Sequence, residues 1–170
     1  QLNGHAGAVN QIVWSPDGTL LATGGDDGTV QIWDATTAEN LRLIQVNSTS
    51  GSSEVDDQIV WSLSWYPDGN YLATGGGDGY IRLWDTDSGE NIAAKNGHND
   101  FVTFLDWSPV DERLISAGAD GVARVWNTAP DPMVLPLPYE YIGLGGWSPD
   151  GEFLTVGSAP GPEKNFQGMV

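Results

Sequence analysis

Both histidines of this 170-residue chain follow a glycine, in the dipeptides Gly4–His5 and Gly97–His98. An imidazole ring is a common general base and metal ligand, so these positions are the first candidates for chemistry. A catalytic or metal site also needs further acids, bases or ligands that converge on the ring. The chain has no cysteine, which excludes thiolate ligands and disulfides. We predict structural roles for both histidines, and no catalytic residue, metal or cofactor.

Two other segments have the composition of ligand sites. The sequence GGGDG at residues 75–79 is rich in glycine, as phosphate-binding loops are, but no helical pattern follows it to supply aligned N–H groups. The sequence WDTDSGE at residues 84–90 gathers three carboxylates. Its Asp-Ser-Gly-Glu part is equally typical of a turn between strands. We interpret both segments as turns and expect no enzyme.

The charge of the chain restricts its partners. There are 23 acidic and 6 basic residues, for a net charge of −17. Such a surface repels nucleic acids and anionic membranes and attracts a basic protein or peptide. The charge could also serve solubility alone. No apolar run is long enough to span a membrane and no signal-peptide pattern is present, so we expect a cytoplasmic protein.

One sequence pattern occurs three times and starts a fourth time. The copies are LATGGDDGTVQIWD at residues 21–34, LATGGGDGYIRLWD at 72–85, LISAGADGVARVWN at 114–127 and the partial WSPDGEFLTVGS at 147–158. A tryptophan near the start of each unit recurs at intervals of 51, 42 and 40 residues, at Trp14, Trp65, Trp107 and Trp147. Such a period is typical of architectures built from repeated structural units.

Each copy consists of short strands separated by turn signals. The sequence SPDG at residues 15–18 and the Asp-Gly pairs of DDG, GDG and ADG favour tight turns. The segments VQIWD, IRLWD and VARVWN alternate with a period of two, as strands with two unlike faces do. No segment has a sustained helical period. We predict an all-β fold.

The period near 42, the Gly-His dipeptide, SPDG, the Asp-Gly hairpin and the closing Trp-Asp together resemble the WD-repeat β-propeller family. The resemblance covers essentially the whole chain. It implies blades of four antiparallel strands around a central channel. We expect one partial propeller of about four repeat units, three complete and one incomplete, at residues 4–44, 55–96, 97–137 and 138–170.

Members of this family typically hold each blade with a hydrogen-bonded chain of histidine, serine or threonine, aspartate and tryptophan. The matching residues of the first and third units are His5, Thr23, Asp27 and Trp33, and His98, Ser116, Asp120 and Trp126. The second unit offers Thr74, Asp78 and Trp84. Because Asp56 stands where its histidine is expected, the histidine link of this unit is absent or replaced.

The fourth unit lacks its closing Trp-Asp strand, and the first residues, QLNGH, match the end of AAKNGH at residues 93–98. Four units form at most an open arc, whereas members of this family usually close a ring with about seven or eight blades. An open arc leaves apolar blade faces without neighbours. We expect either a segment of a larger ring or copies that complete a ring by oligomerisation.

Two segments depart from the repeat and could bind a partner. Residues 45–60 include extra residues relative to the other units, and these are rich in serine, glycine and acids. This predicts an exposed spacer or a phosphorylation or docking site. Residues 127–146 contain four prolines among apolar residues, which predicts an irregular outer strand or an apolar docking strip.

A third candidate lies on the face of the Gly-His loops, where alternation directs large apolar side chains away from the blade interior. The residues concerned are Ile59, Trp61, Phe101 and Tyr141, with acidic neighbours at Asp26, Asp56, Asp57 and Asp100. Aromatic anchors beside carboxylates suit a basic and apolar peptide. The alternative is that these side chains pack against neighbouring blades.

These observations favour a non-catalytic scaffold for protein–protein interaction, with peptide- or protein-binding loops on a propeller face. The alternatives are a sensor or repeat domain of a larger signalling protein, and a self-assembling structural fragment. An enzyme built on a propeller would need convergent acids and bases, and the acidic residues here are mostly explained as turn residues.

Overall fold

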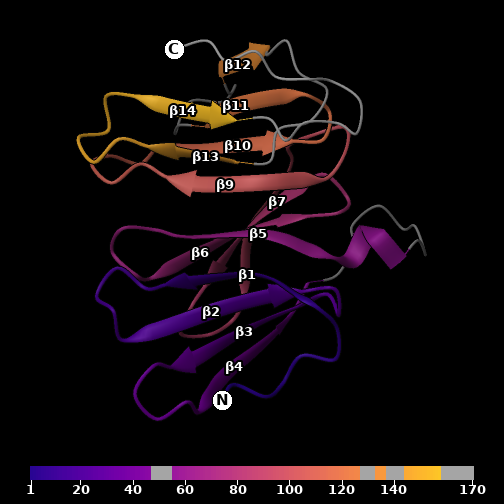
Figure 1. Cartoon of the computed structure of the whole chain (residues 1–170), viewed down its shortest axis with the longest axis vertical. Coiled ribbons are helices and arrows are strands. Elements are labelled where there is room, and N and C mark those ends of the chain that lie inside the picture. Colours follow the sequence, from indigo (N-terminus) through magenta and orange to yellow (C-terminus); the bar gives the residue numbers. More distant parts are fainter. Residues whose placement is uncertain (47–54, 127–132, 137–143, 158–170) are drawn as a thin grey trace.

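The structure, a computed structural model, describes residues 1–46, 55–126, 133–136 and 144–157. Over these ranges the chain forms antiparallel sheets and one 3-10 turn, η1 (Val55–Gln58), and has no α-helix. The only helical turn in these ranges is far too short to cross a membrane. The predicted all-β architecture of four-stranded antiparallel blades is confirmed (Figure 1).

Three sheets have four strands each, joined in sequence order, and a fourth is described by two strands. The first blade comprises β1 (Val9–Trp14), β2 (Leu20–Gly25), β3 (Thr29–Asp34) and β4 (Asn40–Gln45). The second comprises β5 (Val60–Trp65), β6 (Tyr71–Gly76), β7 (Tyr80–Asp85) and β8 (Asn91–Asn96). The third comprises β9 (Val102–Trp107), β10 (Leu114–Gly118), β11 (Val122–Trp126) and β12 (Met133–Pro136). The fourth comprises β13 (Leu144–Trp147) and β14 (Leu154–Gly157).

The blades follow one another along the long axis of the molecule (Figure 1). Their first strands contact each other in the order β1, β5, β9 and β13, so these strands form the inner edge of a fan. Strand β12 is the outermost strand of the third blade, within the proline-rich connector. The rest of that connector, the serine-rich residues 47–54 and residues 158–170 lie outside the described residues.

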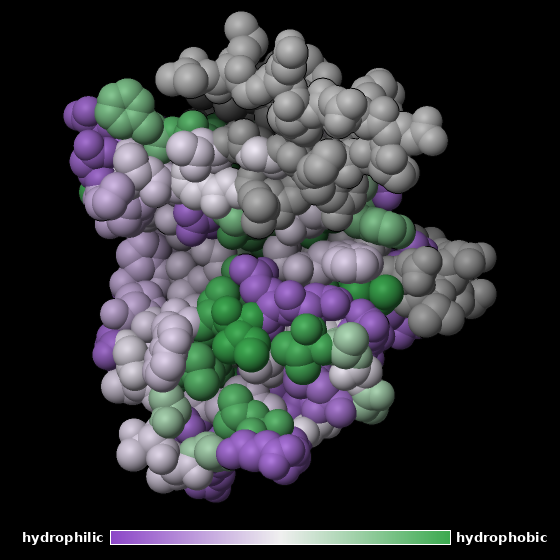
Figure 2. Space-filling view, viewed as in Figure 1, coloured by the Kyte–Doolittle hydropathy of each residue, from purple (hydrophilic) through white to green (hydrophobic). Residues whose placement is uncertain are grey.

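The hydrophobic core lies between blades, and this is clearest from three equivalent positions of the first strands. In β5 these are Val60, Leu63 and Trp65, which pack against the first blade and are 0%, 1% and 6% exposed. The equivalent residues of β1, Val9, Ile12 and Trp14, are 46%, 57% and 60% exposed. Figure 2 shows apolar side chains gathered over this part of the first blade. The same positions are therefore buried only where a preceding blade covers them.

The Asp-Gly hairpins of the first and third blades are held by hydrogen-bonded chains that connect the expected residues. In the first blade, Trp33 Nε1 donates to Thr23 Oγ1 at 2.9 Å, and the imidazole of His5 bridges Thr23 Oγ1 at 2.7 Å and Asp27 at 3.0 Å. The third blade has the same arrangement: Trp126 Nε1 donates to Ser116 Oγ at 2.8 Å. Here His98 lies 2.7 Å from Ser116 Oγ and 2.9 Å from Asp120 Oδ1. These contacts fix the position of the Gly-His loop against the hairpin.

In the second blade an arginine takes the place of the missing histidine. Trp84 Nε1 donates to Thr74 Oγ1 at 3.0 Å, as in the other blades. Arg82 forms two hydrogen bonds to the Asp78 carboxylate, at 3.0 and 2.5 Å, and both side chains are almost fully buried. An added Cβ on Gly76 would meet this guanidinium, whereas one on Gly118 of the third blade would meet His98. The Arg82 guanidinium and the His98 imidazole therefore occupy equivalent places.

The third blade has both a histidine and an arginine beside the hairpin carboxylate. Arg124, which is equivalent to Arg82 in register, lies 3.2 Å from Asp120 Oδ2 and 2.8 Å from His98 Nδ1. Burial acts to raise the pKa of Asp120, but hydrogen bonds from His98 and Asn99 outweigh it and lower the pKa. Burial lowers the pKa of His98, against the influence of Asp120, and the charge of Arg124 lowers it further. The folded blade therefore favours a neutral imidazole.

Replacing Arg82 by alanine is expected to destabilise the protein much more than the matched change Arg124→Ala. Arg82→Ala leaves a buried carboxylate without its bidentate partner, which typically costs about 3–5 kcal/mol. In Arg124→Ala the carboxylate of Asp120 keeps His98, so a loss of about 1 kcal/mol or less is expected. Urea denaturation of the two variants measures the difference, and equal losses would contradict the replacement of the histidine by Arg82.

The lowered pKa of His98 predicts that stability falls on mild acidification. Below the unfolded pKa of about 6.5 the unfolded chain binds a proton at this residue and the folded chain does not. The free energy of unfolding should therefore decrease as the pH falls from about 7.5 to about 5.5. In His98→Gln this part of the slope should disappear. Urea midpoints across that range test the prediction, which an unchanged slope in the variant would refute.

Candidate functional site

The first strands of the blades carry irregularities at the end where the Gly-His loops lie, here called the Gly-His face. In β5 the pairing passes from Val60 to Ser62, so Trp61 is an extra residue that faces no partner in β6. The same shift in β1 leaves Asn10 without a partner in β2. The third blade omits Thr103 from the pairing with β10 in the same way. A bulge redirects the side chain of the extra residue, and bulges are frequent beside functional sites.

The bulge in the second blade turns Trp61 toward the third blade, where it stacks on Phe101. The ring centroids lie 5.8 Å apart and the rings are inclined by 19°. Both residues are partly exposed. Among the described residues nothing accepts a hydrogen bond from the indole nitrogen of Trp61, although this atom is buried. The pair therefore combines apolar surface with an unused hydrogen-bond donor.

Three carboxylates lie near the aromatic pair on the Gly-His face: Asp100 precedes Phe101, Asp57 lies in η1 just before β5, and Asn10 connects Asp26 to the carbonyl of Val60. Asp26 and Asp100 are exposed, and Asp57 is partly exposed in η1. Asp26 accepts a hydrogen bond from Asn10 Nδ2 at 2.9 Å, and Asp100 accepts one from the backbone N–H of Phe101 at 2.8 Å. A carboxylate can accept several hydrogen bonds, so Asp26 and Asp100 can accept further ones from a partner.

The blade framework sets the positions of two of these acids. Asp26 precedes Asp27, whose carboxylate accepts hydrogen bonds from the backbone N–H groups of Ala6 and Thr29 at 2.8 and 3.1 Å. Burial acts to raise the pKa of Asp27, but the bonds from Ala6, His5 and Thr29 outweigh it and lower the pKa. On the third blade, Asp100 follows the loop that Asp120 holds through Asn99 N at 3.1 Å. The aspartates that hold the hairpins thus also place the acidic rim.

The structure brings together part of the predicted patch and places one of its residues differently. Ile59 is 8% exposed, and its carbonyl accepts the N–H of Gly77 at 3.0 Å, so this side chain belongs to the packing and contributes almost no surface. Tyr141 and the side chain of Asp56 lie outside the described residues. Trp61, Phe101, Asp26, Asp57 and Asp100 form the remaining patch, here called the aromatic–acidic patch.

The histidines and acidic turns have structural contacts. His5 and His98 each contact a hydroxyl and a carboxylate within their own blade. Asp85 of the WDTDSGE segment accepts hydrogen bonds from the N–H groups of Asp87 and Ser88, as expected for a turn. Among the described residues, no group of three or more histidines, aspartates and glutamates is arranged to hold a metal ion.

Sequence reasoning did not identify Arg82 as the cation of the second blade. A signal was present, because Arg82 pairs with Thr74 across the hairpin, as Arg124 pairs with Ser116 in the third blade. A long cationic side chain at that register position can reach the hairpin aspartate. The first blade has Gln31 at this place, and its hairpin aspartate contacts His5 instead.

Known proteins share both the sequence pattern and the fold. The family model described as "WD domain, G-beta repeat" matches residues 1–34, 45–85 and 89–127, which is more than half of the chain. The WD40 repeat-containing protein HOS15 of Arabidopsis thaliana is 34% identical over 105 residues, covering 57% of this chain and 17% of the relative. A component of chromatin assembly factor 1 of Schizosaccharomyces pombe is 33% identical over 116 residues, covering 59% of this chain and 22% of the relative.

A solved structure described as the RRP9 WD40 repeats superposes with a TM-score of 0.75 at 24% identity. The match covers 85% of this chain and 43% of that structure, and at this identity it shows the fold alone. This chain thus spans less than a quarter of the length of the two relatives named and less than half of the solved propeller. The matched repeats, the Trp-Asp strands and the four-stranded blades show that this chain belongs to the WD-repeat family.

Proposed function

We propose that this chain is a non-catalytic protein-interaction module that binds its partner through the aromatic–acidic patch. The observation that carries the proposal is the stacked Trp61–Phe101 pair, which spans two blades and keeps a buried indole N–H without an acceptor among the described residues. Tryptophan and other large aromatic residues dominate the binding energy of many interfaces. A carbonyl oxygen of a partner would complete the hydrogen bonding of this indole.

The charge around the pair supports a basic and apolar partner. Asp57 and Asp100 are near the aromatic rings along the chain, Asn10 connects Asp26 to the carbonyl of Val60, and the whole chain has a net charge of −17. Opposite charge on a partner accelerates association and suppresses unsuitable partners, while the rings supply apolar contact area. One relative is by name a component of a chromatin assembly factor, which agrees with a role in assembly. The partner in the proposal is a protein or peptide, not a nucleic acid.

The rival function, an enzyme on a propeller scaffold, has less support. A catalytic group must be free to meet a substrate, whereas both histidines are engaged inside the hydrogen-bonded chains of their blades. The pKa of Asp85 is lowered by the hydrogen bonds from Ser88, as expected of a turn carboxylate that remains charged, and not of a general acid. We therefore keep binding as the proposed activity, as a module or a sensor domain within a larger signalling protein.

The uncovered face of the first blade supports a second interaction, with another blade. Val9, Ile12 and Trp14 on β1, together with Leu41 and Leu43 on β4, are 46% to 63% exposed. The counterparts of Val9, Ile12 and Trp14 on β5, which are Val60, Leu63 and Trp65, are buried by the preceding blade. We propose that a further blade covers this face as well, supplied by the same polypeptide or by a second copy.

Replacement of Trp61 and Phe101 by alanine is expected to abolish capture of the partner by the immobilised protein. Loss of two central aromatic anchors typically costs more than about 2 kcal/mol, or more than about 30-fold in affinity. Quantitative affinity capture compares wild type, the double variant and Phe153→Ala, a control that removes a 66% exposed aromatic side chain elsewhere. If the double variant captures the same proteins as wild type while its melting temperature falls, the pair is structural and the proposal fails.

For the blade face, the paired change Ile12→Glu and Trp14→Glu should reduce self-association of the 18.1 kDa chain. Charged residues at these exposed positions prevent a second apolar face from packing on them. Light scattering coupled to size exclusion measures the mass of wild type and variant. A wild-type chain that is monomeric at all concentrations would contradict coverage by a second copy and leave a blade of the same polypeptide as the occupant.

A further inference from the structure

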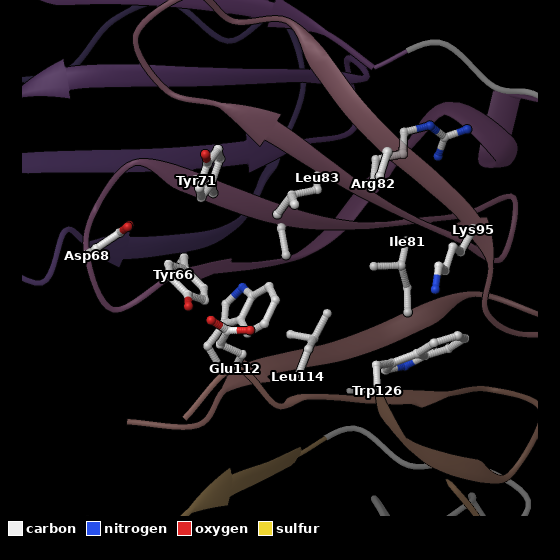
Figure 3. Close-up of a pocket in the computed structure, with 13 residues that line it drawn as sticks. Tyr66, Asp68, Tyr71, Ile81, Arg82, Leu83, Lys95, Glu112, Leu114 and Trp126 are labelled. Atoms are coloured by element: carbon white, nitrogen blue, oxygen red, sulfur yellow. The ribbon is translucent and has the colours of Figure 1, made fainter. Parts of the chain in front are cut away.

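A groove of about 520 Å³ lies between the second and third blades, away from the aromatic–acidic patch (Figure 3). Its volume is within the range of roughly 300–1,000 Å³ that is usual for ligand clefts. The floor is apolar and includes Ile81, Leu83 and Leu114. Tyr66, Asp68 and Glu112 lie together at one end, and Lys95 and Trp126 lie at the other (Figure 3). The groove is therefore elongated, with unlike charges at its ends.

The groove exists because the outer strand of the second blade has an alanine where that of the first blade has an arginine. In the first blade, Arg42 and Ile44 pair with Ile32 and Val30 and face the second blade. The equivalent residues of β8 are Ala93 and Lys95, which pair with Leu83 and Ile81. Arg42 donates a hydrogen bond across the first interface to the carbonyl of Asp87, and Ile44 is 3% exposed. The chain fills the first groove with its own basic and aliphatic side chains and leaves the second groove open.

An aromatic wall replaces the usual turn residue on one side of this groove. The serine of SPDG at residues 15 and 148 donates a hydrogen bond to the aspartate two residues later. At the equivalent position the second blade has Tyr66, whose ring meets Trp107 edge-on at 4.9 Å and Tyr71 at 6.0 Å. Rings in this arrangement present a surface that attracts cations as well as aliphatic groups.

The hydrogen bonding of Trp107 also differs from that of its counterparts. The indole nitrogens of Trp65 and Trp147 donate to carbonyl groups of the preceding blade, Val13 at 3.4 Å and Asp106 at 3.3 Å. The indole nitrogen of Trp107, which lines the groove, is buried and has no acceptor among the described residues. A buried N–H without a partner is rare in folded proteins and is satisfied when a ligand supplies an oxygen.

The charges define how an occupant would lie. Asp68 and Glu112 are exposed carboxylates near the Tyr66 hydroxyl. Burial raises the pKa of this phenol, and the charges of Glu112 and Asp68 raise it further. At the other end, Lys95 Nζ lies 5.9 Å from the ring of Trp126. A cation on the occupant is therefore attracted to the tyrosine end and repelled from the lysine end.

We propose that this groove binds an extended peptide segment of a partner, with an arginine or lysine beside Glu112 and Asp68 and aliphatic side chains over Ile81, Leu83 and Leu114. The segment takes the place that Arg42 and Ile44 fill in the first groove. The proposal rests on the proposed function as an interaction module and adds a second site with its own partner chemistry. The groove lining contains no residue of the aromatic–acidic patch, so the two sites are separable by mutation.

The test uses a fluorescein-labelled peptide, Gly-Arg-Ser-Ile-Ser-Val-Gly, whose alternate residues copy the basic–aliphatic pattern of the first groove. Wild type is expected to bind this peptide, and Ala93→Arg is expected to bind it at least about ten-fold more weakly, because the new side chain fills the groove. The matched control is Ala94→Arg on the other face of β8, which should change affinity by less than about two-fold. Fluorescence anisotropy measures all three affinities.

Two further variants and two peptides define the chemistry. Glu112→Gln should weaken binding about three-fold, as expected for a partly exposed ion pair. Tyr66→Ser, which provides a second test if Ala93→Arg fails to fold, should also weaken it by removing the aromatic wall. A peptide with glutamate for arginine, and one with glycine for isoleucine and valine, should both bind more weakly than the original.

Three results would overturn the inference. The first is absence of peptide binding to wild type at about 1 mM protein. The second is equal binding by Ala93→Arg and Ala94→Arg. The third is light scattering in which Ala93→Arg alone dissociates an oligomer, which would assign the groove to a second copy. None of these affects capture through Trp61 and Phe101, and loss of that capture with intact peptide binding would overturn the proposed function alone.

Discussion

Removing the two apolar faces of each four-stranded sheet from water requires another sheet on either side, and the whole structure depends on this requirement. A WD-repeat blade is too thin to form a core of its own, so stability comes from the interfaces between blades. The comparison of Trp14 with Trp65 shows this directly: the same residue type at the same register position is 60% exposed in one blade and 6% exposed in the next. The sequence therefore repeats at the residues that form the interfaces, because each copy supplies the side chains that pack against the adjacent blade.

A second constraint concerns the polar groups that this packing buries. Each of the first three blades buries an indole N–H, a hydroxyl and a carboxylate at the hairpin, and all three must find partners. The first blade uses His5, the second uses Arg82, and the third uses His98 together with Arg124. What the blades have in common is therefore a donor for the hairpin aspartate, and not a particular residue. The family pattern can lose its histidine without losing the geometry that the histidine supports.

Much of the fold could be predicted from the sequence, because the local signals agree with one another. Period-two alternation, Asp-Gly turns and the spacing of tryptophans all indicate the same four-stranded unit. Ile59 is a residue for which alternation alone was insufficient: alternation directs it outward, but it precedes β5 and its side chain is buried. Arg82 was missed because alternation along β7 does not show that a side chain at this register position reaches back to the hairpin aspartate, Asp78.

The groove between the second and third blades could not be predicted from any single copy. It results from a difference between two outer strands, in which Arg42 and Ile44 are matched by Ala93 and Lys95. That difference has meaning only once the register shows that these positions face the next blade. Without that comparison, the exposed strand β8 has the features of any solvent-facing edge strand.

Departures from the repeat are the most informative positions of such a protein, because the shared residues are explained by packing. Within the described part of the chain, three buried side-chain polar atoms have no hydrogen-bond partner, and two of them are the indole nitrogens of Trp61 and Trp107. One lies in the aromatic–acidic patch and the other in the groove. An unsatisfied buried donor costs stability unless something else satisfies it. Both donors stand beside apolar surface and carboxylates, which is the combination that a basic, partly aliphatic peptide with its own backbone carbonyls would complete.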